Sequence, residues 1–360
     1  MHVRTLWLTD FRSYSSAELD LVPGLTAIVG ANGEGKTNLL EALAWLATLS
    51  SFRGAPTEAL VRQGAPFAIV RALAERDGRE LLVEAQLLPN GRNRVLVNRQ
   101  PLRRARDLLG SLQVTVFTPD DLEIVKDGPG ERRRFLDDAL VALHPRNDVL
   151  RADVDKVLRQ RNALLRQAAG RLDEGAAFTL DVWDERLTHS GEALAAARAD
   201  LLERMQPVLA ATYDTLAREP AEVTARYEAP WRDTGLAAAL RAARAADVRR
   251  GVSTVGPHRD DIVFTVEGAP ARTHASQGEQ RTLALALRLA VHDVVTDTSG
   301  SPPVLLLDDV FSELDPDRGA ALLAHLPAGQ TLLTTASGLP PGADPEVVLR
   351  LAGGTIGPAD

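Results

Sequence analysis

Short apolar runs separated by polar turns fill the first third of the chain, and they predict β-strands. The runs are VRTLWL, AELDL, LTAIVG, FAIVRALA, ELLVEAQLL and RNRVLVN. Asn90-Gly91 separates the last two, and Asn-Gly between apolar runs favours a β-hairpin. We therefore expect an α/β region with a small antiparallel sheet around residues 66–98.

Two stretches in the α/β regions predict helices. Residues 37–48 place leucines and alanines at helical spacing directly after the LTAIVG strand. From Ser276 onward the pattern is ambiguous, because the leucines at 283–289 alternate as in a strand but also fit an i, i+4, i+7 set. Length, alanine content and the S-x-x-E capping box of Ser276 and Glu279 favour a helix that starts at a defined point.

The middle of the chain changes character. From about 130 to 250 it is rich in Ala, Leu and Arg with heptad-like spacing, which predicts an insertion of four or five helices. LQVTVF before it is a strand ended by Pro119, and PPVLLLDDVF, QTLLTTAS and EVVLRLAGG restore the α/β pattern afterwards. We expect one lobe from residues 1–120 and 252–360, and a mostly helical second lobe from 121–251.

Composition narrows the classes of protein. The chain has 360 residues, 45% of them hydrophobic, no cysteine and a net charge of −8. No segment has the pattern of a signal peptide or the 18-residue apolar run of a membrane span, so we expect a cytoplasmic location and no membrane partner. The negative charge argues against coating nucleic acid through bulk positive charge and leaves a local basic face open. Lysine occurs only three times among 41 basic residues, which draws attention to Lys36.

The stretch GANGEGKT matches the phosphate-binding pattern G-x-x-x-x-G-K-[ST], with a predicted strand before it and a helix after it. In such a loop backbone amides surround the phosphates, the lysine charge meets the β- and γ-phosphates, and the threonine hydroxyl binds Mg²⁺. A chance glycine-rich turn is the alternative. The expected ATP-binding residues are Gly30, Ala31, Asn32, Gly33, Glu34, Gly35, Lys36 and Thr37.

The run VLLLDD ends in two carboxylates, as a buried parallel strand beside a ligand site does. Asp308 is then expected to bind nucleotide-associated Mg²⁺ together with Thr37, and Asp309 to polarise the attacking water. Lys36 and Asp309 are the expected catalytic residues. The alternative is that one or both acids only cap the next turn.

Arg12 and two polar segments of the sequence each allow two interpretations. Arg12 in DFRSY follows the first strand and either reaches phosphate or is a solvated loop arginine. TPDDL at 118–122 is a switch segment or only a turn, and GPHRDDI at 256–262 serves an interface or is a charged loop. His258, Asp260 and Asp261 lack a convincing ligand geometry, so we expect no metal site there.

Arginines supply the candidates for DNA contact, with solvated surface faces as the alternative. Six arginines fall between residues 92 and 106 with no acid among them, and few aromatics interleave. Contacts are therefore expected to phosphates, without sequence specificity. The candidates of this kind are Arg103, Arg104, Arg132 and Arg133.

Taken together, DFRSY, GANGEGKT, FTPDDLEIVKDGPGERRRFLD, GPHRDDI, SQGEQRTLALAL and LLLDDVFSELD resemble the RecF family of bacterial recombination mediators. The resemblance runs from Met1 to about Leu351. It implies an ABC-type ATPase lobe like the heads of SMC and Rad50 proteins. It also implies that Ser276–Arg281 is the signature motif, where Ser276 and Gly278 contact the γ-phosphate of ATP held by the other subunit of a homodimer. Ser312–Asp315 then matches the D-loop at that interface.

This sequence departs from the wider ATPase pattern in three ways. Asp309 stands where glutamate is frequent, Thr334 or Thr335 stands where many members carry histidine, and the Q-loop glutamine is not evident in FTPDDL. The resemblance therefore implies slow hydrolysis of ATP and leaves the γ-phosphate sensor undecided.

The function implied by the resemblance is a weak, DNA-stimulated ATPase. Its ATP dimer would clamp duplex DNA near single-strand gaps and, with RecO and RecR, help load RecA. The alternatives are a structural SMC- or Rad50-like ATPase and a transporter nucleotide-binding subunit. The chain is too short for a long coiled coil, and its arginine-rich insertion is unlike a compact transporter subunit.

Overall fold

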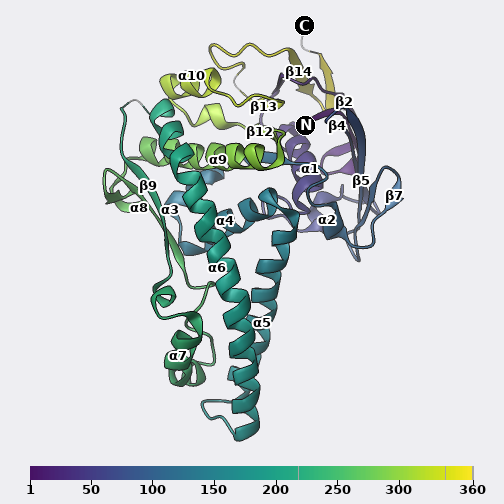
Figure 1. Cartoon of the computed structure of the whole chain (residues 1–360). Helices are drawn as coiled ribbons and strands as arrows, with labels where there is room; N and C mark the ends of the chain where they lie inside the picture. Colours follow the sequence, from purple (N-terminus) through teal and green to yellow (C-terminus); the bar gives the residue numbers. More distant parts are fainter. Residues whose placement is uncertain (218, 337, 359–360) are drawn as a thin grey trace. The chain divides into compact units, whose positions relative to one another are not determined.

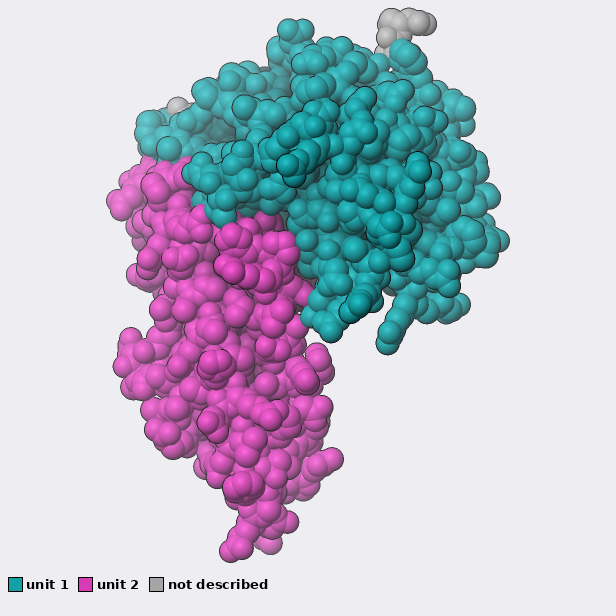
Figure 2. Space-filling model, turned by 45° about the vertical axis from the view of Figure 1, so that its right-hand side comes forward, with its two compact units in different colours: residues 1–122, 211–220, 277–360 teal, residues 123–210, 221–276 magenta. Residues whose placement is uncertain are grey.

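The computed structural model describes residues 1–217, 219–336 and 338–358 (Figure 1). The chain folds into two units, which are coloured separately in Figure 2. Unit 1 consists of residues 1–122, 211–220 and 277–360, and unit 2 of residues 123–210 and 221–276. Within the part of the chain that the structure describes, no helix is both long enough and apolar enough to cross a bilayer.

Unit 1 contains two six-stranded sheets. The antiparallel sheet has the order β2-β1-β4-β5-β6-β7, and the mostly parallel sheet has the order β15-β14-β3-β13-β12-β8. The strands of the first sheet are β1 (His2–Phe11), β2 (Tyr14–Asp20), β4 (Ala68–Arg76), β5 (Arg79–Leu87), β6 (Arg94–Val97) and β7 (Gln100–Pro101). Those of the second are β3 (Leu25–Val29), β8 (Val114–Phe117), β12 (Val304–Asp308), β13 (Thr331–Thr335), β14 (Val347–Ala352) and β15 (Thr355–Pro358).

The predicted antiparallel sheet around residues 66–98 is confirmed, including the β5–β6 hairpin at Asn90-Gly91. A second hairpin is present beside it. Asp77 and Gly78 join β4 to β5 with φ of 53° and 73°, the left-handed pair that a two-residue type I′ turn requires. The Asp-Gly dipeptide is the sequence signal for this turn.

Helix α1 (Lys36–Thr48) lies between the two sheets of unit 1 (Figure 1). Its leucines join one core with residues of both sheets, such as Val70 and Leu306. The neighbouring residues on β12, Leu305 and Leu307, point to the opposite face and pack with Leu285 and Leu289 of α9 (Gln277–Ser299). Because successive strand residues face opposite sides, the continuous apolar run before Asp308 is buried on both faces.

The predicted helix after Ser276 is confirmed as α9. Unit 1 also contains the short helices α2 (Thr57–Leu60) and α10 (Pro316–Ala324). The two sheets are also joined by Gln330, which is 1% exposed. Its side chain accepts a hydrogen bond from Val3 N at 2.7 Å and donates to Val3 O at 2.7 Å and Val22 O at 2.8 Å. A buried amide satisfied in this way fixes β13 against the start of β1.

Unit 2 is mostly helical, with a three-stranded antiparallel sheet of order β11-β10-β9. Its strands are β9 (Val223–Glu228), β10 (Asp261–Val266) and β11 (Ala269–Pro270). Its helices include α4 (Pro129–Leu143), α5 (Asp148–Gln167), α7 (Leu236–Arg250) and α8 (Ala271–His274), while α3 (Leu122–Lys126) and the long α6 (Glu174–Leu216) extend across the unit boundaries.

The unit limits differ from the limits expected from composition. Residues 252–276 belong to unit 2 because β10 pairs with β9 along its whole length, whereas the composition places them in the α/β lobe. Residues 211–220, at the end of α6 and beyond, belong to unit 1. The extent of each lobe as an independent domain stays a prediction.

Candidate nucleotide-binding site

The glycine-rich loop joins β3 to α1 at the carboxyl edge of the parallel sheet. Gly33 and Gly35 have φ of 88° and 105°, a region that other residues rarely adopt. Gly30 is required for a different reason, since a Cβ there would lie 2.7 Å from the carbonyl oxygen of Leu351. The loop conformation therefore depends on glycine at all three positions.

The DFRSY turn supports this loop from the side. The Tyr14 hydroxyl donates to the carbonyl of Gly35 at 3.1 Å, and a Cβ on Gly35 would lie 2.8 Å from Ser13 Oγ. Asn38 Nδ2 also donates to Ser13 Oγ at 3.0 Å. Burial raises the pKa of Tyr14, with the charge of Glu34 acting in the same direction, so the hydroxyl stays a neutral donor. The turn between β1 and β2 thus acts as a brace for the phosphate loop.

Lys36 is 6% exposed and bends back over the loop. Its Nζ donates to the carbonyls of Gly30 at 2.7 Å and Ala31 at 2.9 Å. An ammonium group held against two loop carbonyls places a positive charge at the concave side of the loop. That is where the sequence pattern expects the terminal phosphates.

Three oxygens meet at the end of β12. Asp308 Oδ1 accepts hydrogen bonds from Thr37 Oγ1 at 3.0 Å and from Thr334 Oγ1 at 2.7 Å. Burial raises the pKa of Asp308 and the charge of Asp309 adds to this, while the two hydroxyl donors and the charge of Arg53 oppose it. Burying the ionised carboxylate of Asp308 therefore costs free energy unless a cation binds beside it.

The donor set fits Mg²⁺. This ion binds proteins through one or two oxygen ligands and otherwise through water and substrate phosphates. Thr37 and Asp308 supply two such oxygens side by side. Among the residues that the structure describes, no group of three or more His, Cys, Asp or Glu is placed to hold a metal ion.

Asp309 follows in a left-handed conformation with φ of 49°. Its backbone N–H donates to Thr334 Oγ1 at 3.0 Å, and its carbonyl accepts from Ser312 Oγ at 2.7 Å. Such a conformation costs an L-residue about 1–2 kcal/mol, and Asp is among the few residues that adopt it. The turn directs the chain into the SELD segment immediately after the strand.

Helix α9 begins at Gln277, directly after Ser276, so the signature residues occupy its first turn. A Cβ on Gly278 would lie 3.0 Å from both terminal nitrogens of Arg318. Arg318 itself donates from Nε to Thr282 Oγ1 at 2.9 Å and also pairs with Asp315. A side chain at position 278 would therefore require the guanidinium of Arg318 to shift.

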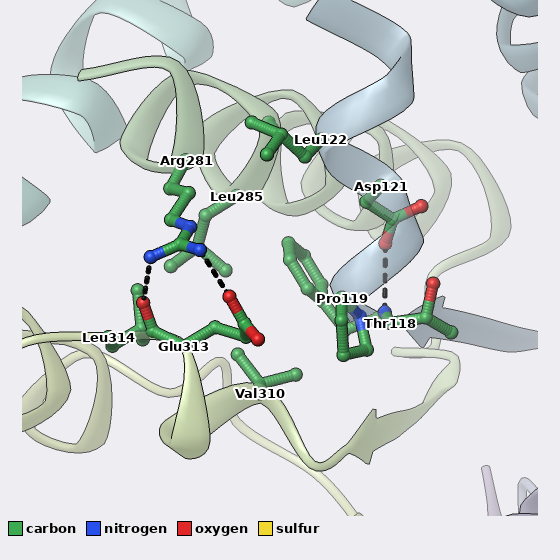
Figure 3. A pocket seen from close by; sticks show the side chains of 11 residues that line it. Thr118, Pro119, Asp121, Leu122, Arg281, Leu285, Val310, Glu313 and Leu314 are labelled. Atoms are coloured by element: carbon green, nitrogen blue, oxygen red, sulfur yellow. Dashed lines mark hydrogen bonds and ion pairs between the residues drawn. The ribbon is translucent and has the colours of Figure 1, made fainter. Parts of the chain in front are cut away.

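A second arginine joins α9 to the SELD segment. Arg281 Nη1 donates to the Glu313 carbonyl at 2.8 Å, and Nη2 pairs with the Glu313 carboxylate (Figure 3). This pair lies at a small pocket whose apolar lining includes Phe117, Leu285 and Val310. Arg281 of the predicted signature and Glu313 of the predicted D-loop are therefore neighbours within unit 1.

The TPDDL segment also contacts α9. Pro119 starts a 3₁₀ turn, Pro119–Asp121, in which Asp121 Oδ2 accepts from Thr118 N at 2.9 Å (Figure 3). Asp121 Oδ1 accepts from Arg288 Nη2 at 2.6 Å. The segment is an anchored turn in this structure, and a switching role stays a prediction.

Arg12 does not extend freely from its loop. It donates from Nε and Nη2 to the two carboxylate oxygens of Glu41, both at 2.7 Å, and from Nη1 to the Ala59 carbonyl at 2.9 Å. Glu41 is fully buried on α1. The expectation of a solvated loop arginine is wrong because Arg12 neutralises this buried carboxylate. A contact with phosphate stays a prediction.

The four arginines predicted to contact DNA separate into two kinds. Arg103 and Arg104 are exposed in unit 1. Arg132 is 4% exposed, donates to both oxygens of Asp261 at 2.7 and 3.0 Å, and so does not offer its guanidinium to a ligand. Its assignment to DNA is corrected on that ground. Arg133 is half-buried and donates to the Asp260 carbonyl at 2.7 Å.

The GPHRDDI segment makes hydrogen bonds with several other parts of unit 2. Asp260 accepts from Tyr227 at 2.5 Å and from Trp231 Nε1 at 2.7 Å, while the Pro257 carbonyl accepts from Arg198 at 2.8 Å. Burial lowers the pKa of His258 to about 4, which keeps its imidazole neutral beside several arginines. The charges of this segment differ in burial: Asp260 is buried among internal partners, Asp261 is half-buried and paired with Arg132, and Arg259 is exposed. A role of the segment at an interface stays a prediction.

Two residues near the site escape the motif patterns. Arg53, in the SFRG stretch after α1, is exposed and close enough for its charge to favour the ionised form of Asp308. Glu41 belongs to the predicted helix but to no motif. Its position on an otherwise apolar helix face is the one sequence signal that could have found it.

The two-sheet lobe, the glycine-rich loop between β3 and α1, and helix α9 define an SMC-type ATPase head. The RecF/RecN/SMC N-terminal domain family matches residues 2–333. RecF proteins of Kineococcus radiotolerans and Streptomyces avermitilis are 44% and 45% identical to this chain, each alignment covering 94% of it and 93% and 94% of the relative. The chain belongs to the RecF family of DNA replication and repair proteins.

Solved structures agree with this assignment. A structure of the recombination mediator RecF with ATP, from the RecFOR pathway, is 28% identical with a TM-score of 0.91, covering 100% of this chain and 98% of that one. An SMC head bound to the C-terminal winged-helix domain of ScpA is 18% identical with a TM-score of 0.59, covering 99% and 96%. The latter shows the shared fold. The predicted α/β, ABC-type P-loop ATPase head with a helical second part is confirmed.

Proposed function

We propose that this chain is an ATP-dependent DNA-binding recombination mediator whose ATP-bound homodimer holds duplex DNA near single-strand gaps. Together with RecO and RecR it helps load RecA during DNA repair and replication restart. Slow hydrolysis of ATP then releases the dimer. The observation that carries the proposal is the convergence of Lys36, Thr37 and Asp308 at one sheet edge in a chain of the RecF family.

The residues of the loop bind and orient the nucleotide. The Lys36 ammonium neutralises charge on the β- and γ-phosphates, and backbone amides of residues 30–37 surround them. Thr37 and Asp308 are the proposed Mg²⁺ ligands, and the ion neutralises phosphate charge when it is bound. Asp309 is the proposed acceptor of a hydrogen bond from the attacking water. The shorter reach of aspartate relative to glutamate supports slow turnover.

The proposed dimerisation uses the predicted signature segment. Ser276 and Gly278 stand at the start of α9, where the helix dipole favours an anion. Under the proposal, that anion is the γ-phosphate of the ATP bound by the other subunit. The interaction is gained with ATP and lost after hydrolysis, so the dimer acts as a timed clamp on DNA.

Two variants test the clamp separately from nucleotide binding. Lys36→Ala removes a charge-assisted contact and should weaken ATP binding by at least about tenfold and prevent dimerisation. Ser276→Arg places a bulky cation at the interface, so it should bind ATP normally and remain monomeric in sedimentation with ATP. Lys156→Ala, at an exposed position of α5, is the matched control for Lys36. Normal ATP affinity in Lys36→Ala contradicts the phosphate-loop assignment, and normal dimers of Ser276→Arg contradict the trans-acting signature.

A further inference from the structure

Two adjacent threonines, Thr334 and Thr335, end β13 beside the strand that carries Asp308. Both are buried, at 1% and 3% exposure. Thr335 Oγ1 donates to the Gly338 carbonyl at 2.8 Å, and its own carbonyl accepts from Gly30 N at 3.3 Å. Thr335 is thus tied to the loop that follows the strand and to the start of the phosphate loop.

Thr334 makes a different pair of contacts. In the parallel pairing of β12 with β13 it lies opposite Asp308. Its hydroxyl donates to Asp308 Oδ1 at 2.7 Å and accepts from the backbone N–H of Asp309 at 3.0 Å. A hydroxyl has one proton, and here that proton goes to a carboxylate. One oxygen atom therefore holds the side chain of the first acid and the backbone of the second.

This arrangement fixes both acids. Thr37 and Thr334 donate to the same oxygen of Asp308 from a helix and from a strand, which limits rotation of the carboxylate. Asp309 adopts a left-handed conformation that an L-residue enters at a cost, and the bond from its N–H to Thr334 holds it there. The direction in which the Asp309 side chain leaves the backbone depends on that conformation.

We infer that Thr334 is a positioning residue for ATP hydrolysis, which sets the orientation of Asp308 toward Mg²⁺ and of Asp309 toward the attacking water. It does so without contacting the γ-phosphate, because its hydroxyl proton is already donated to Asp308. The inference rests on the proposed ATPase function. It assigns a role to one of the two threonines, Thr334 and Thr335, between which the sequence leaves open the position of the histidine of many related ATPases.

The matched variants are Thr334→Val, Thr334→Ser and Thr335→Val. Valine has nearly the shape of threonine and removes only the hydroxyl, and serine keeps it. ATP affinity should be measured in EDTA and over a Mg²⁺ series, alongside kcat and the melting temperature. Removing an outer partner of a metal ligand commonly lowers metal affinity or activity about 10–100-fold, and we expect that range for Thr334→Val in the Mg²⁺ half-saturation and in kcat.

The remaining readouts separate positioning from a general loss of structure. ATP affinity in EDTA should be unchanged in Thr334→Val, because the contacts of Lys36 are untouched. Thr334→Ser should restore Mg²⁺ dependence and kcat, and Thr335→Val should leave the Mg²⁺ dependence of ATP binding as in the parent chain. The inference is overturned if Thr334→Val binds ATP with the parent Mg²⁺ dependence, or if Thr335→Val loses as much. If the parent chain binds no ATP, the proposed function and this inference are both overturned. If the parent chain binds ATP and Thr334→Val has the same Mg²⁺ dependence as the parent, only the inference is overturned.

Discussion

The phosphate-loop region of unit 1 and the Arg161 cluster of unit 2 use charged residues in opposite ways. In unit 1, Lys36 donates to two backbone carbonyls and Asp308 accepts from two hydroxyls. Because these partners are neutral, they do not neutralise either charge. In unit 2, Arg161 is fully buried and bonds to Asp184 at 2.6 Å and Asp247 at 2.8 Å. The first pattern leaves charge for a ligand, and the second neutralises it within the fold.

The comparison teaches how to interpret charged motifs in this chain. GANGEGKT and GPHRDDI both concentrate polar residues, and both stand out in the sequence. Only the first lies at the carboxyl edge of a parallel sheet with its cation bonded to carbonyls. In the second, Asp260 and Asp261 receive their hydrogen bonds from side chains of unit 2. What separates a binding site from a structural cluster is whether partners within the fold already satisfy the motif.

The largest expected effect is on the buried cluster of unit 2. Arg161→Met should lower the free energy of unfolding by about 3–5 kcal/mol, because Asp247 keeps a buried charge without its partner. Arg159→Met, at an exposed position of the same helix, is the control and should change stability little. Urea denaturation measures both. ATP affinity of the folded variant should stay near that of the parent chain, and a large loss of affinity contradicts the division of roles between the units.

The second prediction concerns Asp309. Asp309→Asn keeps the shape but removes the charge, so it should bind ATP normally and lower kcat by at least about 100-fold, the contribution usual for a general base. Sedimentation should then show dimers that persist with ATP. Asp120→Asn, at an exposed position, is the control. Hydrolysis at the parent rate contradicts the role of Asp309 in activating water.

Contiguous motifs are predictable from the sequence because the residues beside them predict the strand or helix in which they lie. GANGEGKT lies between a strand and a helix, and VLLLDD indicates a strand buried on both faces. Contacts between side chains that lie far apart in the sequence are not predictable in this way. Thr334 meets Asp308 26 residues away, and Arg12 meets Glu41 29 residues away, through pairings that no local pattern encodes.

The arginine run at 132–134 shows a second limit. Successive helix residues point about 100° apart, so three adjacent arginines do not share one face. The structure buries Arg132, half-buries Arg133 and exposes Arg134. Charge alone does not distinguish the three, because the position of Asp261 decides which of them is buried.

The third prediction uses a buried histidine of unit 1. Burial lowers the pKa of His292 to about 4, and His292 bonds to Thr115 at 3.1 Å in the core. Its folded pKa lies below its ordinary value of 6.5. The unfolded chain therefore binds more protons between about pH 6.5 and 4, and stability falls as pH drops through that window by up to about 1.4 kcal/mol per pH unit.

His292→Leu should remove this contribution and flatten the dependence of stability on pH between 6.5 and 4. Denaturant unfolding at a series of pH values measures the slope for both chains. His189→Leu, at an exposed position of α6, is the control. An unchanged slope in His292→Leu contradicts the assignment of a neutral, buried imidazole, and would direct attention to His258 in unit 2.

The smallest expected effect concerns DNA binding. It tests whether Arg103 and Arg104, which are exposed, contact DNA phosphates. Each neutralised phosphate contributes about 0.9 to the slope of log affinity against log salt, so Arg103→Ala with Arg104→Ala should reduce the slope by about 1.8 in each subunit that binds. Fluorescence anisotropy over a salt series, with and without a non-hydrolysable ATP analogue, measures it. Arg226→Ala is the control, because Arg226 is exposed but bonded to Glu228 at 2.7 Å.

Comparing DNA binding with and without nucleotide separates two parts of this last prediction: that the dimer assembles the DNA site, and that Arg103 and Arg104 belong to it. If the proposed ATP dimer sets the basic faces of two subunits side by side, affinity and salt slope should both rise when the analogue is added. An unchanged slope on adding nucleotide contradicts a DNA site assembled by the dimer. If the nucleotide effect persists and the double variant keeps the parent slope, only the choice of Arg103 and Arg104 is contradicted. The exposed arginines that flank them between residues 92 and 106 are then the next to change.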